Sequence, residues 1–162
     1  MRITLALLIC VALAGCGGGG EEETAAPKRT ATPAAANEEA AVREMFDSYQ
    51  AALQERDFPA ACQRMAPETT AKLQENIERL GVKNPPTECA EILEAIYGAA
   101  DRSPEQKKLL DEVVETAEVD SVKVTGDAAI INWHATVQGT RTPISQSARK
   151  VDGEWKLVDV TN

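Results

Sequence analysis

The sequence has few of the side chains on which nucleic-acid and metal binding depend. Only 4% of its 162 residues are aromatic, and 26 acidic residues against 17 basic ones give a formal net charge of −9. This leaves little material for stacking bases or for contacting a phosphate backbone. A single histidine, His134, argues against a histidine-based metal centre and a Ser-His-Asp relay, and no glycine-rich phosphate loop follows a predicted strand. We therefore expect no nucleic acid, metal or cofactor as a ligand.

The sequence also lacks an apolar run long enough to cross a bilayer. Residues 3–13 are apolar apart from Thr4, they follow Arg2, and they lead into small residues, four glycines and three glutamates. A transmembrane helix needs about 20 apolar residues. The pattern therefore predicts a cleaved signal peptide over residues 1–15 rather than a membrane span.

The segment Leu13-Ala14-Gly15-Cys16 resembles a bacterial lipobox. The resemblance implies cleavage before Cys16, a diacylglyceryl thioether on the Cys16 sulfur, and acylation of the new N-terminus with a fatty acid such as palmitate. Such acyl chains hold a protein stably on the membrane. We therefore expect a lipid-anchored protein on the extracytoplasmic face of the cell membrane. The alternative is an ordinary secretory signal that leaves Cys16 as a free thiol.

The residues after the expected anchor read as a tether. Residues 17–37 contain a glycine run, a glutamate run and two prolines, and they have no large apolar side chain. Such a segment cannot bury enough surface to order itself. We therefore predict three parts: a signal peptide at 1–15, Cys16 with a flexible linker at 16–37, and a folded domain at 38–162.

The first half of the predicted domain has the spacing of helices. Five residues are expected to start or cap them: Asn37, Asp57, Pro67, Thr87 and Ser103. In the first helix, apolar residues recur on one stripe: Val42, Met45, Phe46, Tyr49, Ala52 and Leu53.

After Ala117 the apolar period changes from 3.6 to 2. Ile131, Trp133 and Ala135 alternate with the polar residues Asn132, His134 and Thr136, and turn residues lie at Gly126, Gly139 and Asp152-Gly153. In the last strand, one side carries Trp155, Leu157 and Asp159. Helices followed by an antiparallel meander predict an α+β fold, with the helices packed across one face of a curved sheet.

This order of elements is similar to that of the NTF2-like superfamily, particularly its small secreted or lipid-anchored bacterial members. The resemblance covers about residues 38–162 and rests on the first helix, the segment 57–62 after it, and the closing strand at 153–157. It implies a cone in which a bent sheet and the first helices enclose a pocket, often with dimerisation through the outer sheet face. The superfamily includes isomerases, dehydratases, cyclases and many non-catalytic binding domains, so the fold alone does not choose the function.

Two further cysteines, Cys62 and Cys89, remain in the expected mature chain. Their number is even, and an exported protein meets an oxidising environment, so we predict a disulfide between them. It would close a loop of 27 positions and stabilise the domain by about 3 to 4 kcal/mol. The alternative is a pair of buried thiols. A redox-active pair is disfavoured because the spacing is not Cys-x-x-Cys.

Tyr49 and Asp159 are the side chains that a resemblance to ketosteroid-isomerase-like members would bring into catalysis. Those enzymes hold a developing oxyanion with a tyrosine and a protonated carboxylic acid, and a second carboxylate moves the proton. No motif here supplies both carboxylates, so we predict no catalytic residue. Ordinary packing is the favoured role of Tyr49, and a solvated strand end that of Asp159.

Three other residues have two interpretations each. Trp133 and Trp155 are either core residues or walls of a ligand pocket. His134 follows Trp133 in the same strand, so it is expected on the polar face, exposed or at a dimer interface.

Three classes of function follow. The favoured one is a non-enzymatic envelope lipoprotein that binds a small apolar ligand or a protein partner. The second is a pocket enzyme of the isomerase or dehydratase kind, which would show paired acids facing the pocket. The third is an accessory subunit of an envelope complex, which would show an exposed apolar sheet patch and a small or filled cavity. A homodimer through the sheet is compatible with any of them.

Overall fold

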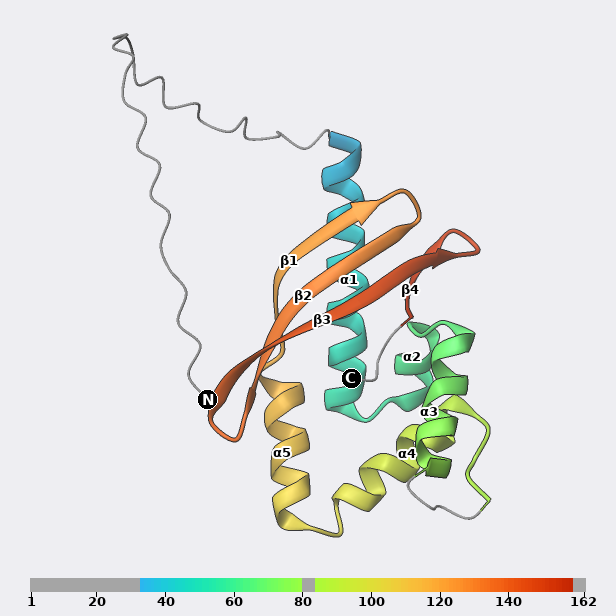
Figure 1. The fold of residues 1–162 in the computed structure, drawn as a ribbon, viewed down its shortest axis with the longest axis vertical. Coiled ribbons are helices and arrows are strands. Elements are labelled where there is room, and N and C mark those ends of the chain that lie inside the picture. The colour runs from blue at the N-terminus through green and yellow to red at the C-terminus, as the bar shows by residue number, and fades with distance from the viewer. Residues whose placement is uncertain (1–32, 80–83, 159–162) are drawn as a thin grey trace, which may run out of the picture. The chain divides into compact units, whose positions relative to one another are not determined.

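The computed structural model describes residues 33–79 and 84–158 (Figure 1). Five helices come first: α1 (Pro33–Glu55), α2 (Phe58–Gln63), α3 (Pro67–Arg79), α4 (Cys89–Ala100) and α5 (Pro104–Glu115). Four strands follow: β1 (Glu118–Thr125), β2 (Ala128–Val137), β3 (Thr140–Val151) and β4 (Glu154–Leu157). This order confirms the predicted α+β class. Cys16 and Asp159 lie outside the described residues, as do the signal peptide and most of the linker.

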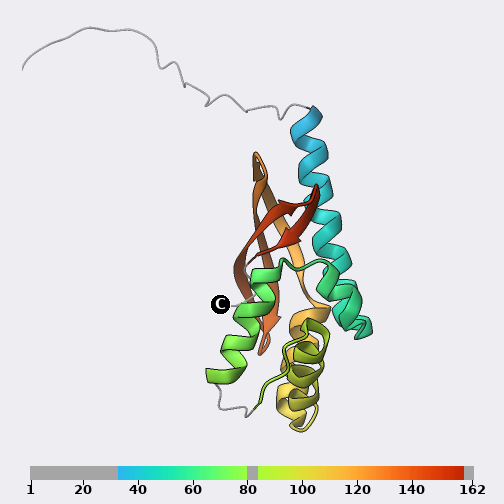
Figure 2. The same cartoon turned by 90° about the vertical axis from the view of Figure 1, so that its right-hand side faces the viewer.

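The four strands form one antiparallel sheet in the order β1-β2-β3-β4. Figure 2 shows the strands curving, with α1 along one face of the sheet. Helix α1 packs against β1, β2 and β4, and α5 packs against β2. The predicted turns are present, and in the last one Asp152 and Gly153 both have positive φ values, 54° and 85°. Two successive positive φ values match the right-handed twist of a hairpin.

Strand alternation places one set of side chains under the helices. The buried residues of β2 are Ala129, Ile131, Trp133 and Ala135. Across the hairpin Trp133 is opposite Ile144, and Ile131 is opposite Gln146. Ile130 points to the other face and is 47% exposed. The predicted inward orientation of Trp133 is therefore confirmed.

Helix α1 begins earlier than the sequence analysis predicted. It starts at Pro33, so Asn37 lies inside the helix and does not cap it, and the end of the predicted linker is helical. Residues 34–36 are all alanine, the strongest helix former, and proline is tolerated in a first helical turn. The alanines therefore extend the helix beyond the expected capping residue.

The other helix starts were mostly predicted correctly. Asp57 caps α2, since its Oδ1 accepts from the backbone N–H of Ala60 at 3.0 Å, and the Ser103 hydroxyl accepts from Gln106 at 3.4 Å. The prediction for Thr87 was wrong. Helix α4 begins at Cys89, after an extended Glu88 whose side chain makes no capping hydrogen bond.

The connection between α2 and α3 runs beside the last strand. The backbone N–H of Leu157 donates to the Arg64 carbonyl at 2.8 Å, and its carbonyl accepts from Ala66 N–H at 2.8 Å. The buried Thr69 hydroxyl also donates to the Leu157 carbonyl, at 2.8 Å. These bonds fix the helical half of the domain to β4. Within residues 33–79 and 84–158, no helix has the length and apolar content of a membrane span.

Candidate ligand-binding site

A cavity of about 240 Å³, called the cavity below, lies between α1, α3, α4, α5 and the middle of β2 and β3. Eight aliphatic side chains line it: Leu53, Leu73, Leu93, Ile96, Leu110, Val113, Val114 and Ile144. Its other lining residues are Tyr49, Gln50, Tyr97, Trp133, Ser145 and Gln146. None of these described residues is charged. The cavity is therefore suited to an uncharged, largely apolar molecule.

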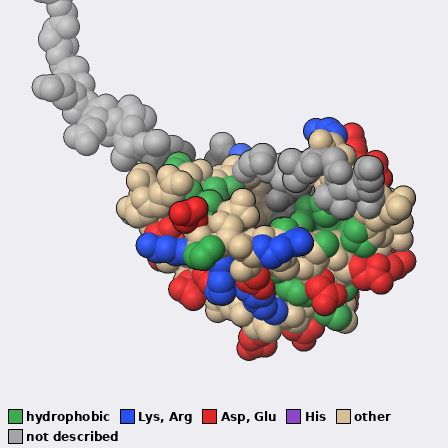
Figure 3. All heavy atoms as spheres, turned by 90° about the horizontal axis from the view of Figure 1, so that it is seen from below, with side chains coloured by type: hydrophobic (Ala, Val, Ile, Leu, Met, Phe, Trp, Pro, Cys, Tyr) green, Lys and Arg blue, Asp and Glu red, His purple; other side chains and the backbone are tan. Residues whose placement is uncertain are grey.

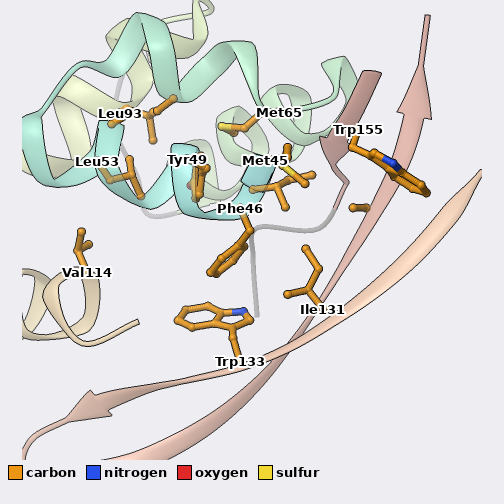
Figure 4. Close-up of a cluster of buried hydrophobic side chains, with 14 of the residues drawn as sticks. Met45, Phe46, Tyr49, Leu53, Met65, Leu93, Val114, Ile131, Trp133 and Trp155 are labelled. Atoms are coloured by element: carbon orange, nitrogen blue, oxygen red, sulfur yellow. The ribbon is translucent and has the colours of Figure 1, made fainter. Parts of the chain in front are cut away.

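Trp133 forms the part of the wall that belongs to the sheet. Figure 4 shows it pointing from the sheet toward α1, where it meets Phe46. The two ring centroids are 5.3 Å apart and the ring planes are inclined by 52°. Aromatic pairs at this separation prefer such tilted arrangements. Trp133 is therefore both a core residue and part of the cavity wall, so both interpretations of it from the sequence apply.

Tyr49 lies on α1 and lines the same cavity. Burial raises the pKa of Tyr49 far above its ordinary value, and the neighbouring Tyr97 raises it further. Burial also raises the pKa of Tyr97, to about 12, although the Arg56 guanidinium opposes that shift. Both phenols therefore stay protonated near neutral pH. They can donate hydrogen bonds, but they do not exchange protons readily.

Tyr97 is held in place from outside the cavity. The Arg56 guanidinium lies over its ring, 5.3 Å from the centroid. Arg56 also donates to both carboxylate oxygens of Asp101, at 2.6 and 2.9 Å. On another side, the ring of Phe58 is 5.0 Å from that of Tyr97, centroid to centroid. These contacts orient a side chain that the sequence analysis did not identify as a site residue.

Gln146 is the second site residue that the sequence analysis missed. It is 5% exposed and occupies an inward position of β3, in register with Ile131. A polar side chain in phase with Ile144 and Ala148 was the feature of the sequence that could have identified it.

Three hydrogen-bond donors at the cavity residues have no partner in the part of the chain that the structure describes. They are the Tyr97 hydroxyl, the Trp133 indole nitrogen Nε1 and the Gln146 amide nitrogen Nε2, all buried. All three side chains line the cavity. A buried polar group without a partner costs about 1 to 3 kcal/mol. An acceptor bound in the cavity could recover that cost.

A second hollow, the groove, adjoins the cavity at the helical end of the domain. It measures about 520 Å³, and residues of α3, α4 and α5 line it, among them Ile77, Ala99 and Leu109, together with Arg102 from the turn between α4 and α5. Ile96, Leu110 and Val113 line both hollows. Figure 3 views this end of the molecule and shows hydrophobic side chains among charged ones. The groove and the cavity are therefore neighbouring hollows with part of their walls in common.

The predicted disulfide is present between Cys62 and Cys89, whose Cα atoms are 6.0 Å apart. It joins α2 to the first residue of α4. Since α4 has no side-chain cap, this bond fixes its start. Helix α4 carries Ile96 and Tyr97, so the disulfide also positions part of the cavity wall.

Trp155 lies away from the cavity, in contrast to the pocket role considered for it. Its Nε1 donates to the Glu38 carboxylate at 2.9 Å, and Lys150 donates to the same carboxylate at 2.8 Å. Lys150 Nζ also lies 5.3 Å from the centre of the Trp155 ring. Trp155 therefore joins α1 to the last hairpin. Asp159, the other pocket candidate, is outside the described residues.

His134 lies on the opposite face of the sheet, as expected. Its Nδ1 is 3.1 Å from the Asp120 carboxylate and 2.9 Å from Arg141 Nη2, which donates to Asp120 at 2.8 Å. In the described ranges, no cluster of three or more histidine, cysteine or acidic residues could hold a metal ion. Of the residues considered from the sequence, Tyr49 and Trp133 both line the cavity. His134 lies outside it and contacts Asp120 and Arg141.

No protein-family model matches this chain, and no curated protein matches it.

Proposed function

We propose that the protein is an extracytoplasmic lipoprotein, anchored through Cys16, whose NTF2-like domain binds a small apolar ligand without transforming it. The observation that carries the ligand-binding proposal is the cavity. It has an uncharged, mainly aliphatic lining, and three of its residues have buried donors without a described partner. Packing alone would favour filling such a space and pairing such donors.

The arrangement of elements supports the proposed fold. Helices precede a curved four-stranded meander, and the cavity lies between α1 and the sheet. The Cys62–Cys89 disulfide supports export, because such bonds persist in oxidising compartments. The anchor itself is proposed from the lipobox resemblance at Cys16.

Binding is favoured over catalysis by what lines the cavity. Proton transfer in a pocket enzyme of the isomerase kind needs a group that gains and loses a proton near neutral pH. No described lining residue is an acid, a base or a histidine. The two phenols, Tyr49 and Tyr97, are protonated near neutral pH, and burial raises the pKa of each further. The lining therefore supplies donors and apolar contacts but no proton acceptor of suitable pKa.

The outer face of the sheet gives less support to an accessory-subunit function. Ile130 is the exposed large hydrophobic residue of the described ranges, and it pairs with Lys123 on one side and Ser147 on the other. One apolar residue between polar neighbours does not make an interface core. Pairing of two copies through this face stays a prediction for an oligomer measurement.

Native mass spectrometry of the exported chain tests the ligand-binding proposal. A Cys16→Ser variant removes the expected lipid, so a retained molecule would have to be held by the domain. We expect an added mass that is lost on mild denaturation. Ile144→Phe, which fills the cavity, should abolish it, whereas Ile130→Phe on the other face should not. An absent mass, or one that Ile144→Phe retains, would contradict the proposal.

A further inference from the structure

The ligand class can be narrowed, on the premise that the proposed binding function holds. We infer that the ligand is an uncharged molecule with a hydrogen-bond acceptor, such as a carbonyl oxygen, held by Tyr97, Trp133 and Gln146. Its apolar body fills the cavity and continues past Ile96 and Leu110 into the groove.

The acceptor follows from the three buried donors. Tyr97, Trp133 and Gln146 are 5%, 8% and 5% exposed, and they come from α4, β2 and β3. Two of the donors can turn toward a bound molecule without backbone movement, because a phenol hydrogen rotates about its C–O bond and a glutamine amide rotates about χ3. All three residues line the cavity from separate elements, so an acceptor oxygen bound there has three candidate donors once these side chains turn toward it.

The absence of charge in the cavity lining indicates that the part of the ligand inside the cavity is neutral. A carboxylate buried in the cavity would find no lysine or arginine among the described lining residues, and an amine would find no acid. The nearby Arg56 is already bound to Asp101 through two hydrogen bonds. Burying an unpaired charge is far costlier than burying a hydrogen-bonded neutral group. A carbonyl, ester or amide therefore fits better than an ion.

The aliphatic lining favours an apolar body over a cluster of waters. A buried water needs two to four polar partners, and the eight aliphatic residues of the lining offer it none, so only the part of the cavity beside the polar side chains suits water. Because a dry cavity of about 150 Å³ accommodates benzene, the 240 Å³ cavity has room for about ten non-hydrogen atoms. The adjoining groove offers a further 520 Å³. Ile96, Leu110 and Val113 border both spaces and therefore lie between them, so a longer chain would have to pass over these apolar side chains.

Three probes of nearly equal size separate these requirements: acetophenone, cumene and benzoate. They share an aromatic ring, and they carry respectively a neutral acceptor, no polar group and a charge. Binding to the exported Cys16→Ser chain is followed by the indole N–H signals in the ¹H–¹⁵N NMR spectrum. A Trp155→Phe variant assigns the Trp133 signal, since the chain has two tryptophans.

We expect acetophenone to bind at least tenfold more tightly than cumene or benzoate and to shift the Trp133 indole proton. Gln146→Leu and Tyr97→Phe should each reduce the acetophenone advantage severalfold while cumene still binds. The NMR spectrum of each variant reports directly whether it is folded.

The other possible binding results each contradict a different part of the proposal. If no probe binds, the proposed binding function itself fails. If cumene binds as tightly as acetophenone, the cavity is an apolar binding site, but the acceptor inference is wrong. If benzoate binds most tightly, the uncharged class is wrong.

The groove is tested with octanophenone, which adds an alkyl chain to the same carbonyl. We expect it to bind at least tenfold more tightly than acetophenone. Ala99→Trp, on the groove wall, should remove this gain, whereas Ala51→Trp, on an exposed position of α1, should preserve it. An equal gain in both variants would overturn the extension into the groove.

Discussion

Phe46 on α1 and Trp133 on β2 contact each other through tilted rings with centroids 5.3 Å apart. Phe46 is fully buried, and Trp133 continues from this contact into the cavity wall. The pair therefore joins the first helix to the sheet at the point where the domain is hollow. Loss of either ring affects the stability of the fold and the shape of the cavity together.

Replacing Phe46 by alanine is expected to lower the free energy of unfolding by about 3 to 5 kcal/mol, because it removes buried surface and leaves a void. Urea unfolding followed by circular dichroism measures the change. Ile130→Ala, on the exposed outer face of the sheet, is the control and should change it by less than about 0.5 kcal/mol. Similar losses in both variants would show that the Phe46–Trp133 contact is not a core contact.

Removal of the Cys62–Cys89 disulfide is expected to destabilise the domain by about 3 to 4 kcal/mol, because the unfolded chain regains the freedom of a 27-position loop. The double variant Cys62→Ala/Cys89→Ala and the reduced wild-type protein should melt at similar, lowered temperatures. Ligand affinity should also fall, since α4 carries Tyr97 and begins at the disulfide. An unchanged melting temperature would mean that the bond does not constrain the fold.

Acid is expected to destabilise the domain through Glu38, Glu68 and Asp101. Hydrogen bonds from Lys150, Arg149 and Arg56, respectively, lower the pKa of each carboxyl below its ordinary value. A lowered pKa in the folded state stabilises the fold above the unfolded-state pKa. That contribution is lost as the pH falls through the lower, folded-state pKa.

The pH dependence can be assigned with a neutral variant. Between pH 7 and pH 3, the free energy of unfolding of the wild-type protein should decrease, and Glu68→Gln should make the decrease shallower. Glu91→Gln, at an exposed position of α4, serves as the control and should follow the wild-type curve. If Glu68→Gln follows the wild-type curve as well, its pair with Arg149 makes no net contribution to stability.

Lipid attachment is expected to depend on one cysteine. In a bacterial host, Cys16→Ser should abolish both labelling by radioactive palmitate and cleavage of the predicted signal peptide. Cys10→Ser changes a thiol inside that peptide and should leave both unchanged. A Cys16→Ser protein that is still labelled by palmitate would contradict the lipid anchor.

Local patterns predicted most of the fold. Alternation in β2 placed Trp133 inward and His134 outward, and the caps at Asp57 and Ser103 marked two helix starts. These features depend on neighbours within a few residues. The predicted helix start at Asn37 was wrong. A good capping residue does not set the start of a helix when the alanines before it already favour helix.

The site could be predicted only in part, because it depends on contacts between distant segments. Tyr49 and Trp133 were identified, but Tyr97 and Gln146 reach the cavity from α4 and β3 through tertiary packing. The phase of Gln146 with Ile144 and Ala148 indicates only that it points inward, and no local pattern predicts that it meets Tyr97. Trp155, an equally good candidate from its strand position, is bound to Glu38 instead.

The central claim is that the cavity holds a small apolar molecule, and a titration with cumene tests it most directly. Isothermal titration calorimetry compares the exported Cys16→Ser protein with the same protein carrying Ile144→Phe or Ile130→Phe. We predict saturable binding with one site per chain, lost in Ile144→Phe and retained in Ile130→Phe. No saturable binding up to the solubility limit of cumene, or equal binding in Ile144→Phe, would contradict the account.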